Sequence, residues 1–346
     1  MFEELHIQNY RIFRDLKVSQ LGHINLFAGK NNTGKTSLLE AVFLLAGAGN
    51  ARMLMNSNIV RVDPGTTVLG DTFWKPFFSD LDKHSPIEIR GRYASIGQLA
   101  LEITWGGQQK KETLTDYLSA QSVTNLSDEL SLTVRYRGPD EELIESYIFA
   151  ENKEIQVDQP DIVVPFRAAS LHSSNVSSRD DAIRLATLRK QKSDHLLLEA
   201  LRVVEPKLQS IEDNSASGTP MIWGDIGLSE LIPLAVMGEA MNRIARIVLA
   251  ITGAPDGVVL VDEVENGIHH SVLPEVWRVI NKVAIQLNCQ VIATTHSLEC
   301  VRAAFDALQE DDFRLHRLEA NQDENRCVTY DSETIGAALD FNLEVR

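Results

Sequence analysis

Cysteine is scarce in this chain of 346 residues, with only Cys289, Cys300 and Cys327 present. The odd number and the lack of a paired spacing argue against a disulfide framework and favour a reducing compartment. Basic residues are also outnumbered, 33 against 49 acidic ones, which gives a formal net charge of -16 at pH 7. A surface this acidic is unsuited to coating a nucleic-acid backbone, although a local basic groove remains compatible with it.

Long apolar runs are missing as well. No stretch approaches the roughly 18 apolar residues that a membrane-spanning helix needs. The opening segment, MFEELHIQNYRIFRDL, is charged and alternating, and therefore differs from a secretory signal. We accordingly expect a cytoplasmic protein without membrane contact. Its length and its 44% content of hydrophobic residues fit one large domain, or a core with an insertion.

Both ends of the chain have the pattern of an α/β protein. Near the N-terminus we expect three strands and a helix, over 5–9, 16–18, 24–27 and 35–46. After a small polar segment that predicts a loop, 213–220, helices and strands should alternate before a hairpin and a last helix. The expected ranges are helix 228–250, strand 258–261, helix 270–287, strand 290–294, strands 313–318 and 326–330, and a helix from residue 332.

The middle of the chain has a different pattern. Four alternating segments separated by turn residues predict an antiparallel meander over 87–93, 99–105, 130–136 and 143–149. Apolar residues at helical spacing then predict a helical arm over 179–211, interrupted near Lys192 and bent or ended before Pro206. Residues 51–85 lack a clean period, and we expect the aromatic residues of DTFWKPFFSD to pack under a loop rather than to stack on bases.

Together these patterns predict an α/β fold: a mixed sheet flanked by helices, with an antiparallel β subdomain and a helical insertion. The expected organisation is one split domain of three parts, an N-terminal lobe at 1–50, an insertion at 51–215 and a C-terminal lobe at 220–346. The insertion would separate residues that belong to one site.

A glycine-rich loop follows the strand expected at 24–27. It matches the pattern G-x-x-x-x-G-K-[ST] and lies between a buried strand and an amphipathic helix. In such a loop the backbone N–H groups and the helix start converge on phosphate groups. Lys35 should hold the β- and γ-phosphates, and the Thr36 hydroxyl should bind Mg²⁺. The predicted nucleotide-binding residues are Gly29, Asn31, Asn32, Thr33, Gly34, Lys35, Thr36 and Ser37.

Two later strands end in polar residues. One runs into Asp262 and Glu263, and the next is followed by His296. Because the carboxyl ends of parallel strands share an edge, these residues are expected to meet the phosphate loop. Asp262 would bind Mg²⁺ through water, Glu263 would polarise the attacking water, and His296 would sense the γ-phosphate, with Lys35 as the third catalytic residue. The alternatives are a solvated strand end and a structural histidine.

Four segments in order carry a family resemblance: HIQNYRIFRDL, GKNNTGKTSLLEA, LVDEVENGIHH and VIATTHSLEC. The chain resembles ABC-type ATPases of the SMC, RecF and OLD (overcoming lysogenisation defect) class, in particular small stand-alone AAA-family ATPases without a Toprim nuclease domain. The resemblance covers 1–50 and about 228–346. It implies a P-loop ABC-type ATPase head that uses ATP and Mg²⁺, hydrolyses ATP, and sandwiches it in a C2 homodimer.

The resemblance also implies further residues near the nucleotide. Met237 to Arg243 is the candidate signature helix that completes the partner's site, and an ordinary amphipathic helix is the alternative. Since Ala240 stands where a second glycine is expected, the contact would depend on Gly238. Arg11 and Arg14 resemble family residues near the nucleotide, although exposed basic side chains on an edge strand fit equally well.

Two loops of the family are harder to assign. Glu265 to His269 is similar to the loop that crosses to the other subunit. The glutamine of the Q-loop is either Gln98, or it is missing and Phe166 to Asn175 takes its place. A zinc site at His269, His270 and His296 is disfavoured because the chain lacks a zinc-ligand spacing.

The leading hypothesis is an ATPase whose ATP-driven dimerisation regulates a separate effector. OLD proteins carry a Toprim nuclease domain after the ATPase, whereas the 50 residues after His296 contain no D-x-D cluster. The effector, a nuclease or a toxin, is therefore expected to be another protein in DNA repair or phage defence. One alternative is a RecF-like DNA-binding clamp, with basic residues of 179–207 on DNA rather than on a solvated helix face. Another is a nucleotide-dependent scaffold with negligible turnover.

Overall fold

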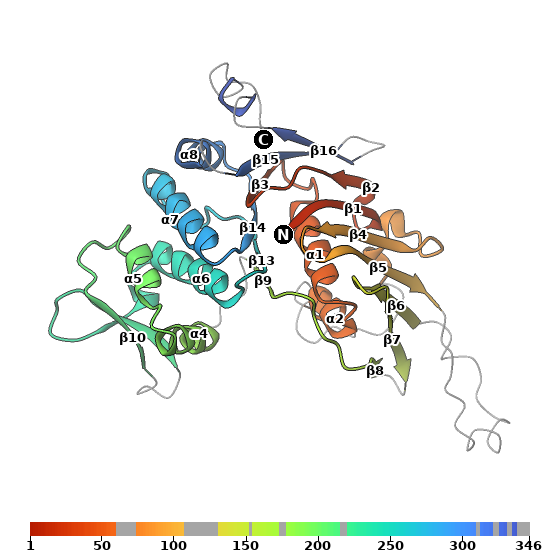
Figure 1. Ribbon diagram of the computed structural model, residues 1–346, viewed down its shortest axis with the longest axis horizontal. Coiled ribbons are helices and arrows are strands. Elements are labelled where there is room, and N and C mark those ends of the chain that lie inside the picture. The colour runs from red at the N-terminus through yellow and green to blue at the C-terminus, as the bar shows by residue number, and fades with distance from the viewer. Residues whose placement is uncertain are drawn as a thin grey trace.

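The computed structural model contains two large sheets and a small one, with helices between and beside the large sheets (Figure 1). The residues that the structure describes are 1–59, 74–106, 131–151, 154–172, 178–214, 220–308, 312–320, 325–330 and 334–337. The statements that follow concern these residues.

A six-stranded sheet holds the strands that were expected to be buried. Its order is β16-β15-β3-β14-β13-β9, and all neighbours pair in parallel except β16. The bounds are β3 Ile24–Ala28, β9 Ala168–Leu171, β13 Val258–Val261, β14 Gln290–Thr295, β15 Phe313–Ala320 and β16 Asn325–Tyr330. Every residue of β3, β13 and β14 is buried, as their largely apolar sequences predict.

A seven-stranded antiparallel sheet contains the predicted meander. Its order is β2-β1-β4-β5-β6-β7-β8. The bounds are β1 Phe2–Tyr10, β2 Phe13–Val18, β4 Ile87–Tyr93, β5 Gly97–Trp105, β6 Ser131–Arg137, β7 Leu143–Glu151 and β8 Glu154–Asp158. The N-terminal hairpin joins this sheet because β1 pairs with β4, with Leu5 opposite Gly91. The start of the chain therefore extends the meander.

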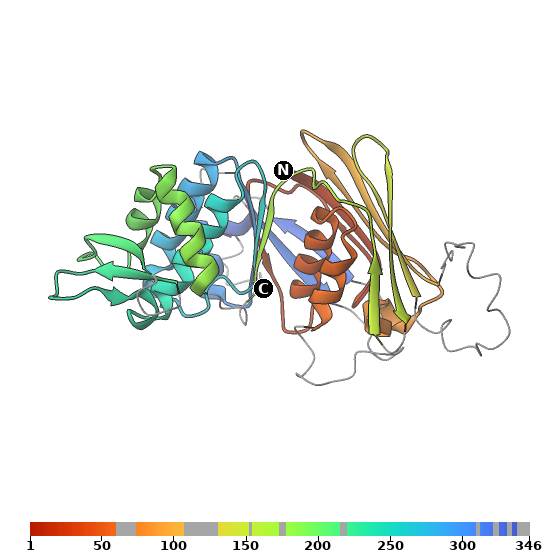
Figure 2. The ribbon, with the colours of Figure 1, turned by 90° about the horizontal axis from the view of Figure 1, so that it is seen from below.

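One helix lies between the two large sheets. This helix, α1 Lys35–Ala46, begins directly after the glycine-rich loop and packs against both sheets (Figure 2). Successive side chains of a strand point to opposite faces of the sheet, so only every second residue of a buried strand packs on the side of α1. Val258 and Leu260 join the core around α1, while Val259 and Val261 join the core on the opposite face.

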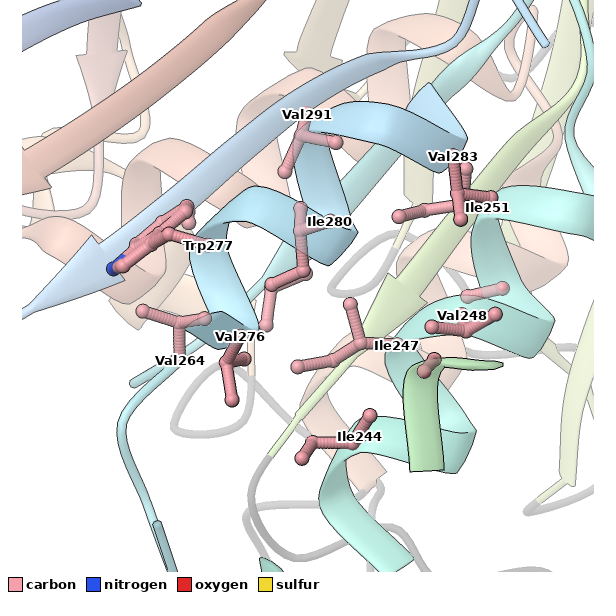
Figure 3. Packing of buried hydrophobic residues seen from close by; sticks show 14 of the residues in the cluster. Ile244, Ile247, Val248, Ile251, Val264, Val276, Trp277, Ile280, Val283 and Val291 are labelled. Atoms are coloured by element: carbon pink, nitrogen blue, oxygen red, sulfur yellow. The ribbon is translucent and has the colours of Figure 1, made fainter. Parts of the chain in front are cut away.

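Three helices cover that opposite face. They are α6 Glu239–Gly253, α7 Leu273–Gln286 and α8 Leu298–Leu308. Figure 3 shows Ile247 and Ile251 of α6 turned toward Ile280 and Val283 of α7. Each aliphatic side chain buried in this way contributes about 1.5–3 kcal/mol. None of the described helices is long and apolar enough to cross a membrane.

The expected helical arm contains less helix than predicted. It begins with α4 Ser178–Lys190 and α5 His195–Leu201, and Lys192 in the predicted break has a φ of 57°. The chain then enters β10 Ser210–Asn214, which pairs with β11 Met221–Asp225. The helix thus ends before Pro206, as expected, whereas the helical spacing up to residue 211 is misleading at its end, because a short apolar run fits either structure and pairing with β11 decides for strand.

The helix expected from residue 228 begins later. Residues before it form β12 Ile232–Pro233 and a 3₁₀ turn, η4 Leu234–Val236. Gly238 then has a φ of 123°, a backbone conformation that favours glycine, and α6 starts at the next residue. The prediction was wrong here because apolar spacing continues through a segment whose backbone is not helical.

In the described parts of 51–85, which are 51–59 and 74–85, the structure has a helix and two 3₁₀ turns. They are α2 Ala51–Ile59, η1 Lys75–Phe77 and η2 Ser79–Leu81. Trp74, Phe77 and Phe78 are at most 1% exposed, which confirms the expected packing role of these aromatic side chains. Residues 71–73 of that stretch lie outside the described part.

The helix expected from residue 270 begins as the 3₁₀ turn η5 His270–Val272 and continues as α7, and residues 334–337 are helical.

A buried glutamine joins the starts of two strands in different sheets. Gln290 Nε2 donates to the carbonyls of Phe2 and Gly22, and its Oε1 accepts from the N–H of Phe2, each at 2.8 Å. The two sheets are thus pinned together where β1 and β14 begin.

The partition at residues 50 and 215 remains a prediction, since strands from the first two expected parts occur in both large sheets.

A buried histidine lies within the six-stranded sheet. His316 of β15 is 0% exposed and its ring stacks on Phe27. Its ring nitrogens lie 3.0 Å from Thr329 Oγ1 and 3.2 Å from Asn25 Oδ1. Burial, with a smaller contribution from Arg314, lowers the pKa of His316 from 6.5 to about 3. The folded protein therefore keeps this ring neutral where the unfolded chain would protonate it.

We expect His316 to make the fold sensitive to acid. Between its unfolded pKa of 6.5 and its folded pKa of about 3, only the unfolded state binds the proton, so the free energy of unfolding falls as pH drops. Between pH 7 and pH 5, His316 should lower the free energy of unfolding by about 2 kcal/mol. Urea unfolding at both pH values measures this. Between pH 7 and pH 5, the free energy of unfolding of His316→Gln should fall by about 2 kcal/mol less than that of the unmodified protein. Equal losses would contradict the prediction.

Candidate functional site

The loop between β3 and α1 has the shape of a phosphate cradle. Gly34 has a φ of 95°, and a Cβ at this position would lie 2.5 Å from the ring of Phe13, so the turn requires glycine. Thr33 Oγ1 donates to the carbonyl of Lys30 at 2.9 Å and closes the loop. The residues at its exposed rim are Lys30, Asn31 and Asn32.

Lys35 is held inside this loop. Its Nζ donates to the carbonyls of Gly29 at 2.7 Å and Lys30 at 2.9 Å. Burial lowers the pKa of Lys35, while the three carboxylates after β13 act to raise it. Ser37, two residues later in α1, is also buried. The ammonium group is therefore bonded to carbonyls that phosphate oxygens could replace, beside carboxylates that favour its charge.

Asp262 connects the loop to the ends of two strands. Its Oδ2 accepts from Thr36 Oγ1 at 3.0 Å, and its Oδ1 accepts from Thr294 Oγ1 at 2.6 Å. A carboxylate and a hydroxyl beside a phosphate loop are the protein ligands that Mg²⁺ uses together with phosphate oxygens. The described residues contain no group of three or more His, Cys, Asp or Glu that could hold a metal ion. The pair of Thr36 hydroxyl and Asp262 carboxylate fits Mg²⁺.

Glu263 and His296 lie side by side at the same edge. The N–H of Glu263 donates to Thr294 Oγ1 at 2.9 Å, and its Oε2 accepts from Asn266 Nδ2 at 2.6 Å. The backbone of Glu263 has a φ of 48°, a conformation that residues other than glycine rarely adopt. His296 Nδ1 lies 3.7 Å from Glu263 Oε1, and the two side chains are 48% and 37% exposed. The predicted residues that meet here are Lys35, Thr36, Asp262, Glu263 and His296.

Arg243 supports this edge, although the sequence reasoning did not single it out. It lies in α6, is 5% exposed, and donates through Nη2 to the carbonyls of Asp262 and Glu263. Burial lowers the pKa of Arg243, and the nearby carboxylates oppose that effect. The next residue of the loop, Val264, lies in the apolar cluster with Trp277 (Figure 3). The backbone of the loop is thus held by a buried cation and by the core.

The start of α6 is exposed beside the same loop. A Cβ on Gly238 would meet no atom within 4 Å. A Cβ on Gly267, in the loop after β13, would lie 2.3 Å from the side chain of Glu239, so this loop packs against the first residue of α6. Val236, just before the helix, is 72% exposed. The candidate signature segment therefore begins at an open surface.

Arg11 is not an exposed residue of an edge strand. Its side chain is 9% exposed, and its Nε lies 2.7 Å from Glu40 Oε2 on α1. Burial acts to lower the pKa of Arg11, but Tyr10 and Glu40 outweigh burial and the pKa is raised. Its Nη2 is buried and has no hydrogen-bond partner within the described part. Arg14 is exposed and pairs with Asp80 at 2.6 Å. Contact of either arginine with a nucleotide stays a prediction.

The end of β9, in one of the two segments considered for the Q-loop, lies beside the site. This strand pairs in parallel with β13, and the N–H of Asp262 donates to the carbonyl of Leu171 at 2.9 Å. His172 follows and lies next to Asp262 along the sheet edge. Of the two positions considered for the Q-loop, Gln98 lies in β5 of the antiparallel sheet, whereas 166–172 leads to the site. The rest of that segment lies outside the described residues.

Sequence comparison identifies a matching family and several relatives. A family model described as "AAA domain, putative AbiEii toxin, Type IV TA system" matches residues 24–302. An ATP/GTP phosphatase of Helicobacter pylori is 24% identical over 97% of this chain and 94% of its own length. The DNA replication and repair protein RecF of Heliobacterium modesticaldum is 24% identical over 38% of this chain, and the match spans only 30% of RecF.

The solved structures that share this fold include SMC heads. The SMC head bound to the C-terminal winged-helix domain of ScpA has a TM-score of 0.52 and 12% identity, covering 95% of this chain and 97% of that one. A second head, from Pyrococcus furiosus, has a TM-score of 0.51 and 10% identity, covering 99% of both chains. These likenesses confirm the predicted ABC-type head fold. With the family match, they confirm the resemblance to the SMC, RecF and OLD class.

Proposed function

Since this chain belongs to the AAA-domain family whose model it matches, and is an ATPase of the SMC- and RecF-like class, we propose that ATP joins two copies of it and that hydrolysis separates them. The name of the Helicobacter pylori relative, an ATP/GTP phosphatase, agrees with nucleotide hydrolysis. The observation that carries the proposal is the meeting of the phosphate loop with Asp262, Glu263 and His296 at one sheet edge.

The loop and the start of α1 would bind the nucleotide. Their N–H groups and the positive end of the helix attract phosphate groups. Lys35 Nζ, which is bonded to the carbonyls of Gly29 and Lys30, would turn to the β- and γ-phosphates. Thr36 and Asp262 would hold Mg²⁺, which when bound neutralises charge on the phosphate oxygens.

Glu263 is the proposed general base. Its carboxylate reaches solvent and is held at the strand end by Asn266, so it can accept a proton from a water that attacks the γ-phosphate. His296 lies beside it and would contact the γ-phosphate. Loss of the γ-phosphate would remove this contact, which provides a route from hydrolysis to a change in shape.

The start of α6 is the proposed contribution to the partner's site. Gly238 is exposed, and the large apolar side chain of Val236 beside it would be covered by a second copy. With Ala240 in place of a second glycine, the approach depends on Gly238 and on the first N–H groups of the helix. Arg243 of the same helix bonds to the carbonyl of Glu263, so a contact at the helix start can affect the general base. Two equivalent contacts would give C2 symmetry.

We also propose a separate effector protein, acting in DNA repair or phage defence. The family description names a toxin and a Type IV TA system, and an SMC head of this fold was solved with a domain of another protein bound. The DNA-clamp alternative depends on basic residues of 179–207, of which Arg189 bonds to Asp213 at 2.9 Å and Arg184 lies 3.7 Å from Asp181. Such pairing weakens the positive field that DNA would meet. A protein effector is therefore favoured over direct DNA binding.

Glu263→Gln should stop turnover while ATP binding persists. The amide cannot accept the proton, so ATP turnover should fall by about 10²-fold or more. Lys35→Ala should lose binding itself, because it removes the cation of the phosphate loop. Phosphate release and equilibrium binding of a fluorescent ATP analogue measure the two effects, with Glu275→Gln, an exposed residue of α7, as the matched control. Tight ATP binding by Lys35→Ala, or unmodified turnover no faster than that of Glu263→Gln, would contradict the assignment.

Mixing two inactive variants should restore activity if each site is shared between copies. Each proposed site combines the phosphate loop of one copy with the start of α6 of the other. Lys35→Ala damages the first part and Gly238→Asp the second. In a mixed dimer, the loop of the Gly238→Asp copy and the helix start of the Lys35→Ala copy therefore form one intact site. Because each mixed dimer has one working site of two, the recovered rate should approach at most roughly half of the unmodified rate. Phosphate release from each variant alone and from the equimolar mixture checks this. A mixture as inactive as its components would rule out the shared site.

Partner binding should follow the nucleotide state. Glu263→Gln with ATP should hold the dimer, whereas Lys35→Ala should not form it, so the two are matched baits. We expect at least one protein to be enriched on Glu263→Gln with ATP and to be absent from Lys35→Ala. Quantitative mass spectrometry of proteins captured from the native cell measures this difference. Identical sets on both baits would count against a nucleotide-regulated effector.

A further inference from the structure

A third carboxylate lies behind His296 and has no part in the mechanism above. Glu265, in the loop after β13, has a side chain that is only 10% exposed. Its Oε1 accepts two hydrogen bonds, from Thr295 Oγ1 at 2.7 Å and from the backbone N–H of His296 at 3.2 Å. Because Thr295 is the last residue of β14, Glu265 ties the loop after one strand to the end of its neighbour.

The ring of His296 faces the same carboxylate. Its Nδ1 lies 3.4 Å from Glu265 Oε1 and 3.7 Å from Glu263 Oε1. With carboxylate oxygens on this side, a proton on Nδ1 is favoured, and the other ring nitrogen, Nε2, is left for a different partner. The backbone bond from His296 to Glu265 holds the residue that carries the ring, so one carboxylate acts on both its position and its tautomer.

We propose that Glu265 is a positioning residue for His296: it fixes the direction of the ring and keeps a proton on Nδ1, which leaves Nε2 for the γ-phosphate. The inference rests on the proposed role of His296 in ATP hydrolysis. Phosphate oxygens accept hydrogen bonds, so on ATP binding the ring takes a second proton from water at Nε2, and this Nε2–H donates to the phosphate while the Nδ1–H stays with Glu265. The partner in question is thus the terminal phosphate of a nucleoside triphosphate.

The second oxygen of Glu265 favours this role over a purely structural link. Its Oε2 is buried and has no hydrogen-bond partner within the described part. A buried polar atom without a partner is destabilising, and a neutral glutamine could also accept the bonds from Thr295 and His296. What the carboxylate adds is charge. That charge acts on the ring and on the two cations of the site, since Glu265 is among the groups that act to raise the pKa of Lys35 and of Arg243.

Nitrogen NMR of the histidine ring tests the inference directly, because protonated and unprotonated ring nitrogens resonate far apart. In nucleotide-free protein labelled with ¹⁵N-histidine, we expect a neutral His296 ring to carry its proton on Nδ1, with His296→Ala providing the assignment. In Glu265→Gln the proton should move largely to Nε2. Glu299→Gln is the matched control, because this carboxylate accepts from the Ser297 hydroxyl at 2.9 Å. An unchanged ring in Glu265→Gln, or the same shift in Glu299→Gln, overturns the proposal.

Turnover provides a second readout. In Glu265→Gln, kcat should fall by about 10- to 100-fold, as for other residues that orient a reacting group, while KM changes by less than about twofold. An unchanged kcat, or a raised KM with an unchanged kcat, overturns the proposal. The NMR measurement needs no hydrolysis. A protein that binds ATP without turnover would therefore refute the proposed function and still leave the tautomer of His296 as a test of Glu265.

Thr295→Val carries the same test if Glu265→Gln does not fold. Valine has nearly the shape of threonine but no hydroxyl, so Glu265 loses the bond of 2.7 Å and keeps its charge. A smaller shift of the ring proton toward Nε2 and a fall in kcat of a few-fold are expected, with thermal unfolding as the check on the fold. A Thr295→Val protein with the unmodified spectrum and kcat overturns the inference.

Discussion

The site depends on the two hydrogen bonds that the Asp262 carboxylate accepts, from Thr36 and from Thr294. They join the helix start after β3 to the ends of β13 and β14, three adjacent strands of one sheet. Asp262 is therefore held beside the phosphate loop, and Glu263 follows it with a left-handed backbone that Thr294 and Arg243 support. Moving any of these strands by one residue would turn the polar groups away from the common edge.

The layers around the six-stranded sheet make that edge rigid. Its strands β3, β14 and β13 are buried on both faces, by α1 and the antiparallel sheet on one side and by α6, α7 and α8 on the other. The strand ends are the part of the sheet that these layers leave uncovered, and the polar residues of the site lie there. The antiparallel sheet is fastened to this arrangement through Gln290 at the strand starts and through the Arg11–Glu40 pair on α1. Phe13 also packs over Gly34, so the N-terminal hairpin supports the loop itself.

The parts of the site that follow from local sequence could be predicted, and those that depend on distant contacts could not. The loop before Lys35 and the residues after β13 and β14 were recognisable because a strand, a polar end and a helix are each encoded within a few neighbouring residues. Arg243 and Glu265 lie in segments that the family resemblance indicates, but their contacts could not be predicted: their partners lie 19 to 31 positions away, and a buried cation or carboxylate in a helix or loop resembles many exposed ones. The late start of α6 was missed because Gly238 breaks a helix that apolar spacing alone would continue.

The sequence by itself determined the ABC-type class, the buried strands and the order of the groups that meet the phosphates, because glycine pattern and hydrophobic period act locally. Only the tertiary structure decided which neighbours those groups have. It placed the N-terminal hairpin in the antiparallel sheet, brought β9 and His172 beside Asp262, and set Glu265 behind His296. Such neighbours are set by strand order and side-chain packing across the whole chain, which no short stretch of sequence contains.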